Sequence, residues 1–378
     1  MKKTITLLLT LTLIIGTVLG TVNVNADSSS NLSFKYVITP KSPEWKNFTP
    51  VELKKKLNIP IQDAENMDTG TLLNVILDYP FLGDIYAFDD PLKGIDFLAV
   101  QFNGLKVLLE REDLKDKLVE GYKDSANKIM KLNDSEKINN EERHKHKYRE
   151  ALLSYPAVFN KLNKTEKDII VSDSKKVADK IDTNPINVEH ADKFGSPASR
   201  KAAFTAAFRA TLTASRSSIL TTMPALMLAA AGDTIRTGYV GTPNFTLVEV
   251  FEREEMSISD KNALDAYITS VYPYAIRLRS ASYKYNCHSY AWYSTSASNT
   301  WWMNNPTAYM TDGSYIKRTT ATSGMKAYYG AGHTGIISSV SGTNITVTSK
   351  WGGYGLYTHA EYSCPYYSGI LNTYWQLF

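Results

Sequence analysis

The composition of the chain changes abruptly near residue 274, and this change limits what each part can fold into. Five of the six tryptophans and 15 of the 24 tyrosines lie from Tyr274 onward, in a stretch rich in Gly, Ser and Thr. Apolar and polar residues alternate there, as in β-strands, whereas residues 31 to 193 carry apolar positions at helical spacing. We therefore expect an α+β protein in which a mainly α-helical N-terminal region precedes a C-terminal domain built on an antiparallel sheet.

The length of 378 residues also exceeds one typical domain core. The sequence predicts four segments. They are a signal peptide over residues 1–26, a helical N-terminal domain over 27–195, a helical connector over 196–275, and a C-terminal domain over 276–378.

The N-terminus has the three-part layout of a secretory signal peptide. Two lysines precede an apolar run from about Ile5 to Leu19, and the small-residue site VNA ends at Ala26. This apolar run is shorter than the roughly 20 residues that a membrane-spanning helix needs. We expect cleavage after Ala26 and a secreted bacterial protein with no stable membrane span, released or held non-covalently at the cell wall.

Several helix signals stand out before residue 274. Thr49, Pro50 and Glu52 form a capping box with proline at the first helical position, and Ser259 is expected to cap a helix that Pro273 ends. The charge run over residues 132–150 predicts a solvated helix or linker, with His144 and His146 at the surface and not on a metal. The apolar segment 201–233 predicts a buried helix pair, with membrane-surface association as the alternative.

Charge is mild overall and uneven along the chain. The formal net charge is +4 and the pI is about 8.7, but seven Lys or Arg residues against two acidic ones lie from Arg277 onward. Such a surface favours polyanions, including cell-wall polymers. An ordinary solubilising surface is the alternative. We expect no nucleic-acid partner, and the oligomeric state stays open.

Only two cysteines, Cys287 and Cys364, occur in the chain, so no disulfide framework is expected for this secreted protein. The two thiols either form one bridge, or at least one is kept free for chemistry. In the stretch YNCHSYAWY, Asn286 is a good N-cap and places Cys287 in the first helical turn. The helix dipole there favours a thiolate, which is the nucleophilic form of cysteine.

A histidine base for this thiol is predicted on a following hairpin. His333 begins the first of two alternating runs joined by the turn SGTN, and pairing of Val340 with Ile345 sets their register. Without a bulge, Thr348 and Lys350 share a face with His333, whereas a one-residue bulge turns Ser349 to that face. His288 points away from Cys287 on a helix, and His359 is a weaker candidate for the base.

These two motifs resemble a known family. NCHSYAW, followed 46 positions later by GHTGIISSVSGTNITVTSKWG, is similar to the CHAP domain, the cysteine- and histidine-dependent amidohydrolase/peptidase family within the NlpC-type, papain-like group. The resemblance covers about the last hundred residues. It implies a papain-like domain in which a helix packs on an antiparallel sheet, with Cys287 as nucleophile and His333 as general base.

The resemblance also implies an oxyanion site and a residue that orients the histidine. The backbone amide of Cys287, with the side chain of Asn286 or Tyr285, would face the oxyanion. The family places Asn, Asp, Glu or another acceptor in the orienting role. This chain departs from that pattern, and Ser349 is our candidate.

We therefore expect a secreted cysteine amide hydrolase that acts on peptidoglycan peptides and needs neither a metal nor an organic cofactor. One alternative is a thiol protease or deamidase that acts on proteins. Another is a non-catalytic, cell-wall-binding or adhesive protein, in which Cys287 is either oxidised, for example in a bond to Cys364, or unreactive.

Overall fold

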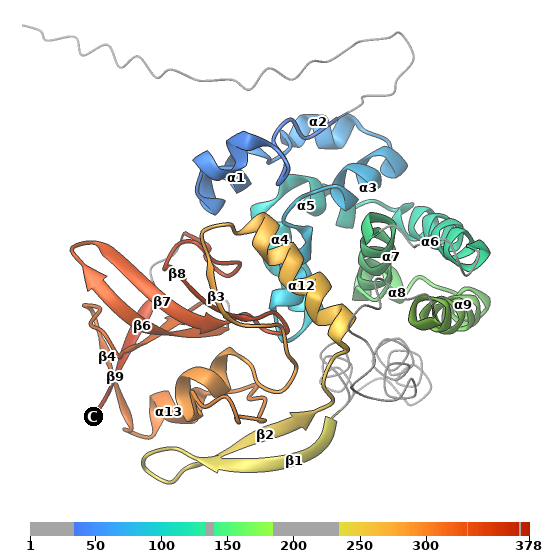
Figure 1. The fold of residues 1–378 in the computed structure, drawn as a ribbon. Helices are drawn as coiled ribbons and strands as arrows, with labels where there is room; N and C mark the ends of the chain where they lie inside the picture. Colours follow the sequence, from blue (N-terminus) through green and yellow to red (C-terminus); the bar gives the residue numbers. More distant parts are fainter. Residues whose placement is uncertain (1–33, 133–139, 184–233, 331, 370–371) are drawn as a thin grey trace, which may run out of the picture.

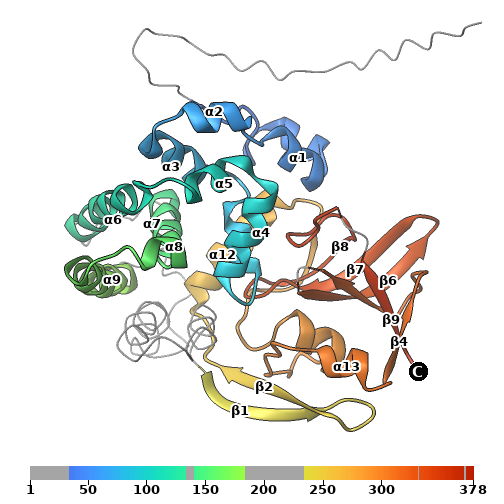
Figure 2. The same cartoon turned by 180° about the vertical axis from the view of Figure 1, so that it is seen from behind.

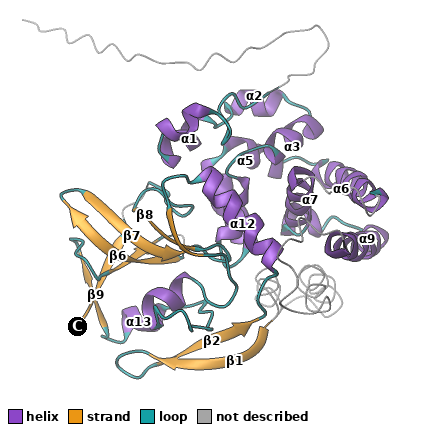
Figure 3. Ribbon diagram, viewed as in Figure 1, coloured by secondary structure: helices purple, strands orange, loops and turns teal. Residues whose placement is uncertain are grey.

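The computed structural model describes residues 34–132, 140–183, 234–330, 332–369 and 372–378. The predicted signal peptide and the apolar segment 201–233 lie outside these ranges. Within them, helices make up the N-terminal part and strands dominate the C-terminal part (Figure 3), which confirms the α+β class. None of the described helices is both long enough and apolar enough to cross a membrane.

The N-terminal part is a succession of short and medium helices. They are η1 (Pro43–Asn47), α1 (Pro50–Lys56), α2 (Ile61–Asn66), α3 (Thr69–Leu77), η2 (Leu82–Ala87), α4 (Pro91–Gln101), α5 (Asn103–Leu109), α6 (Leu114–Lys131), α7 (Asn140–Leu153), α8 (Pro156–Phe159) and α9 (Lys164–Thr183). The predicted capping box is confirmed, because the Thr49 side chain accepts from the Glu52 amide while the Glu52 carboxylate accepts from the Thr49 amide. Figure 1 shows these helices gathered on one side of the molecule.

The described part of the charge run lies on α7 and is only partly solvated, and the prediction that His146 lies at the surface is wrong. In α7, His146 is buried, and its Nδ1 lies 2.7 Å from Ser125 Oγ on α6. Arg143 and Glu150 are buried as well. Residues 143, 146 and 150 recur at steps of three and four, so they share one helix face, and that face packs inward although it is polar.

The C-terminal part contains a hairpin, one long helix and a larger sheet. Its elements are β1 (Thr234–Gly241), β2 (Leu247–Arg253), α12 (Ile258–Val271), β3 (Ile276–Arg279), the π-helical η4 (Ser289–Tyr293), α13 (Thr307–Thr311), β4 (Tyr315–Arg318), β5 (Lys326–Tyr329), β6 (His333–Ser341), β7 (Asn344–Lys350), β8 (Leu356–Ala360) and β9 (Thr373–Leu377). The cap of α12 is Ser257 and not Ser259, because the Ser257 side chain accepts from the Asp260 amide at 3.1 Å.

The larger sheet has seven strands in the order β3-β8-β7-β6-β5-β9-β4, and every pair is antiparallel. The predicted pairing of Val340 with Ile345 is confirmed. A bulge between Ile337 and Ser339 shifts the rest of the register, so Ile337 pairs with Val347. Because side chains alternate along a strand, Ser349 lies on the same face as His333.

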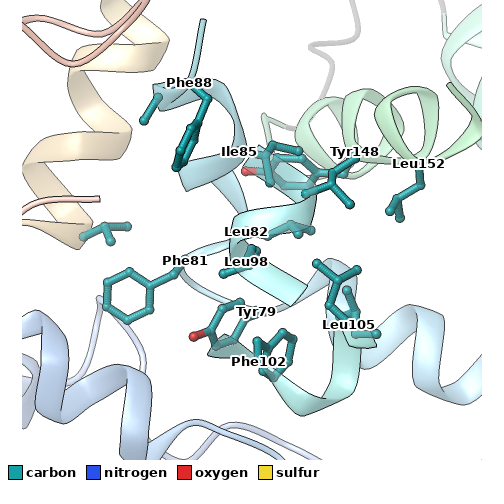
Figure 4. Packing of buried hydrophobic residues seen from close by; sticks show 14 of the residues in the cluster. Tyr79, Phe81, Leu82, Ile85, Phe88, Leu98, Phe102, Leu105, Tyr148 and Leu152 are labelled. Atoms are coloured by element: carbon teal, nitrogen blue, oxygen red, sulfur yellow. The ribbon is translucent and has the colours of Figure 1, made fainter. Parts of the chain in front are cut away.

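One face of this sheet packs against the helical part. Buried side chains from β5 to β9 belong to one continuous hydrophobic cluster with the helices, and the predicted boundary near residue 276 falls within it. Figure 4 shows the helical side of this cluster, in which the rings of Tyr79 and Phe102 stack 3.9 Å apart. The helix α12 lies between the other helices and the sheet in both views (Figures 1 and 2).

The opposite face of the sheet is covered by η4 and α13, and the β1–β2 hairpin packs outside them. Val240, Val248 and Val250 of the hairpin form a second cluster with Ala291, Trp292, Met303 and Tyr309. The sheet therefore separates two packed layers. One is the helical part, and the other carries the segment that follows Cys287.

Candidate functional site around Cys287

Asn286 begins the helical segment that carries Cys287, as the sequence predicted. Its Oδ1 accepts from the backbone amide of Ser289 at 3.1 Å, and Cys287 is the first helical residue. The Asn286 amide group has two N–H bonds, which donate to Met303 O at 2.7 Å and to Asp89 Oδ2 at 2.9 Å. Both donors are therefore engaged, and Asn286 has none left for an oxyanion.

Both cysteines are free thiols, so the predicted alternative of a Cys287–Cys364 bridge is not formed. The side chain of Cys287 is buried, with 2% of its surface exposed. Burial raises the pKa of the Cys287 thiol far above its ordinary value, and the Asp89 carboxylate raises it further. The backbone amide of Thr334, which lies beside the sulfur, lowers the pKa only in part. The thiol is therefore protonated in this arrangement.

His333 is completely buried and faces away from the segment that carries Cys287. Its ring lies parallel to the Tyr366 ring, with centroids 3.6 Å apart, and its centroid is 5.2 Å from that of Tyr329. Within the described ranges, neither ring nitrogen of His333 has a hydrogen-bonding partner. Burial lowers the pKa of His333 well below its ordinary value, so the imidazole is neutral.

The next residue on β6 is Thr334, and its side chain points to the other face of the sheet. Thr334 Oγ1 lies 2.9 Å from His288 Nδ1 and accepts from Trp292 Nε1 at 3.1 Å. Since neighbouring side chains on a strand point to opposite faces, His333 points to the helical part and Thr334 to the Cys287 segment. The Cys287 sulfur thus lies beside the backbone next to His333, but the predicted thiol–imidazole hydrogen bond is absent.

Ser349 shares a face with His333 but does not orient it. Ser349 Oγ lies 2.8 Å from His359 Nε2 and accepts from Trp351 Nε1 at 2.9 Å. Burial lowers the pKa of His359 to about 4, and its Nδ1 lies 2.8 Å from Ala360 O, so the neutral ring carries its proton on Nδ1. Ser349 then donates to His359 Nε2. The expectation that Ser349 orients His333 is corrected by this pairing.

Tyr285 and His288 flank Cys287 in the sequence. The Tyr285 hydroxyl oxygen accepts from Arg279 Nη1 at 3.2 Å. The ring of His288 is neutral because burial lowers its pKa to about 4, and its nitrogens contact Thr334 Oγ1 and the Gly332 carbonyl. His288 therefore has no free nitrogen to take a proton from Cys287.

Lys350 is a buried cation that the sequence did not single out as functional. Its Nζ donates to the carbonyl oxygens of Ser282, Gly352 and Tyr354, at 2.8, 2.5 and 2.5 Å. These three acceptors match the three N–H bonds of an ammonium group. Burial lowers the pKa of Lys350 to about 7. The sequence pattern does not reveal this role, because the three acceptors lie outside β7, and Ser282 is 68 positions away.

Two hollows occur in the described part of the chain away from Cys287. One of these lies between α1 and the Tyr272–Ala275 turn, and the other lies on the surface around Glu110 and Arg111. Within the described ranges, no group of three or more His, Cys, Asp or Glu side chains could hold a metal ion.

Comparison with known proteins adds no relative. No protein-family model matches the chain, and the searches among curated proteins and solved structures found no match either. The chemistry of the site therefore has to be argued from these residues alone.

Proposed function

We propose that the chain is a secreted cysteine amide hydrolase that cleaves peptidoglycan peptides, with Cys287 as nucleophile and His333 as base. The observation that carries this proposal is the pair of unpaired nitrogens on the buried His333. A buried polar group without a partner costs roughly 1–3 kcal/mol. A second arrangement, in which His333 meets the Cys287 thiol, would remove that cost.

The surroundings of Cys287 support the same chemistry. A capped helix start and the nearby amides of Thr334 and His288 favour a thiolate once a base is present. Gly332, directly before His333, has a φ of +79°, and a Cβ atom added to it would meet no other atom within 4 Å. No side chain of the described residues packs against that position.

In the proposed reaction, His333 takes the proton of Cys287, and the sulfur attacks the carbonyl carbon of the scissile amide. The C–N bond breaks when the imidazolium returns that proton to the leaving amine, and an acyl-thioester remains on Cys287. Water then adds to the thioester with His333 as base. The products are a carboxylic acid and the free thiol.

A non-catalytic, wall-binding role is the second candidate. It is favoured by the placement of His333 and Thr334, because the imidazole and the Cys287 segment occupy opposite faces of the sheet. If this role is correct, the protein should bind purified cell walls, and substitution of Cys287 or His333 should not change that binding.

The test is digestion of purified peptidoglycan and of an unfolded protein by the full mature chain. Release of new amino groups from peptidoglycan should be lost in Cys287→Ala and His333→Gln. It should persist in Cys364→Ala, which removes the other buried thiol. If the unfolded protein is digested and peptidoglycan is not, the chain is a thiol protease instead. Wall binding without any amide cleavage would replace it with the non-catalytic role.

A further inference from the structure

The helical part contributes a side chain to the surroundings of Cys287. Asp89, in the loop between η2 and α4, accepts a hydrogen bond from Asn286 Nδ2 at 2.9 Å, across 197 positions of sequence. Asn286 is completely buried and begins the helical segment of Cys287. The Asp89 carboxylate therefore completes the hydrogen bonding of the residue that fixes where Cys287 lies.

The residues around Asp89 are packed closely enough to fix its position. Ala87 O accepts from the Tyr366 hydroxyl, and Tyr366 in turn stacks on His333. A Cβ atom on Gly352, which has a φ of +49°, would lie 2.2 Å from Ala87 O. The loop from Ala87 to Asp90 thus contacts both the Asn286 cap and the ring that covers His333.

Three cationic side chains and two neutral ones face Asp89. Arg253 of β2, Lys93 of α4 and Lys350 of β7 lower its pKa, but burial outweighs them and raises the pKa to about 6. The neutral groups are the Cys287 thiol and the Tyr366 hydroxyl, and the Asp89 carboxylate raises the pKa of both. A negative charge beside the sulfur disfavours a second negative charge on it.

We propose that Asp89 is a positioning residue of the Cys287 site, which holds the Asn286 cap and, when ionised, opposes ionisation of the Cys287 sulfur. A contribution of Asp89 to catalysis rests on the function proposed above. The effect of Asp89 on the ionisation of the Cys287 thiol can be measured without a substrate. The helical part is then a component of the site and sets the reactivity of the thiol.

The test follows Cys287 by NMR in the full mature chain with Cys364→Ser, so that one cysteine remains. The protein carries cysteine labelled with ¹³C at Cβ, and the Cβ shift is recorded between about pH 4.5 and 8.5. We expect an inflection near pH 6 from Asp89, which Asp89→Asn removes. Ionisation of Lys350 gives a second inflection near pH 7 that persists.

Asp90→Asn is the matched control. Asp90 is the next carboxylate in the loop, and it caps α4 by accepting from the Leu92 amide at 2.9 Å. Asparagine keeps this cap, so the inflection near pH 6 should remain. Asp89→Asn should also speed alkylation of Cys287 by iodoacetamide near neutral pH, because it removes a negative charge that disfavours the thiolate.

The proposal is overturned if the Cys287 Cβ shift of the Asp89-containing protein has no inflection near pH 6. It is also overturned if that inflection persists in Asp89→Asn. If Asp89→Asn fails to fold, the presence or absence of the inflection in the Asp89-containing protein decides. If the inflection is present but no amide is cleaved, Asp89 has the proposed role and the hydrolase function is wrong. If amides are cleaved but the inflection is absent, the hydrolase function stands and the role of Asp89 is wrong.

Discussion

The aromatic ring of Tyr366 lies flat against the imidazole of His333, with 6° between the ring planes. Tyr366 comes from the segment after β8 and His333 from the first position of β6. Both side chains are buried at the junction of the sheet and the helical part. This stack keeps His333 on the helical side of the sheet.

Removing the ring that covers His333 should free the imidazole. Tyr366→Ala is expected to lower the free energy of unfolding by roughly 3–5 kcal/mol, as for other buried aromatic residues. It should also raise the pKa of His333, because burial is the main cause of its depression. Denaturant unfolding and the NMR titration of the histidine ring check these two effects. Tyr362→Ala, at a side chain that is 41% exposed, is the control and should change neither.

The buried, neutral His333 should make stability depend on pH. Its pKa is depressed in the folded protein, so the unfolded chain binds the proton more tightly, and stability falls as pH drops below about 6.5. His333→Gln should remove up to about 1.4 kcal/mol of this loss per pH unit between pH 6.5 and 5. Denaturant unfolding at several pH values measures the slope. Equal slopes in both proteins would contradict a neutral, buried His333.

Lys350 should be essential for stability through its three carbonyl contacts. Lys350→Met leaves the carbonyls of Ser282, Gly352 and Tyr354 without this donor, and the expected loss is roughly 3 kcal/mol or more. Lys317→Met, at an exposed position of β4, should change stability by less than about 0.5 kcal/mol. A Lys350→Met protein as stable as the Lys317→Met control would show that these contacts contribute little.

The turn of the β1–β2 hairpin should be improved by glycine. Phe245 has a φ of +63° and is 89% exposed, so it bears the strain of a left-handed backbone without packing to offset it. Phe245→Gly is expected to raise the free energy of unfolding by about 1 kcal/mol, whereas Phe245→Ala keeps the strain and should not. Thermal and denaturant unfolding of both variants check this. Lower stability of Phe245→Gly would mean that the phenylalanine ring stabilises the turn.

Local sequence signals predicted the fold well where the structure depends on neighbours in the chain. The Thr49 capping box, the Asn286 cap and the Val340–Ile345 pair all depend on residues close in sequence, and all three are present. The helix cap at Ser257 was missed by two positions, because serine occurs at both 257 and 259.

The site was harder to predict because it depends on contacts between distant parts of the chain. The direction of His333 is set by which face of the sheet the helical part covers, and Asp89 reaches Asn286 across 197 positions. No spacing rule reveals either contact. The bulge beside Ser338 was foreseen as one option, but the pairing of Ser349 with His359 required the register of β7 on β8.

A covalent intermediate on Cys287 tests the central claim most directly. The mature protein is incubated with peptidoglycan fragments, quenched in acid and digested, and the peptides that contain Cys287 and Cys364 are examined by mass spectrometry. The account predicts an acyl group on Cys287 that hydroxylamine removes, with none on Cys364. Cleavage of the fragments while Cys287 stays unmodified, at time points that trap the reaction before completion, would contradict it.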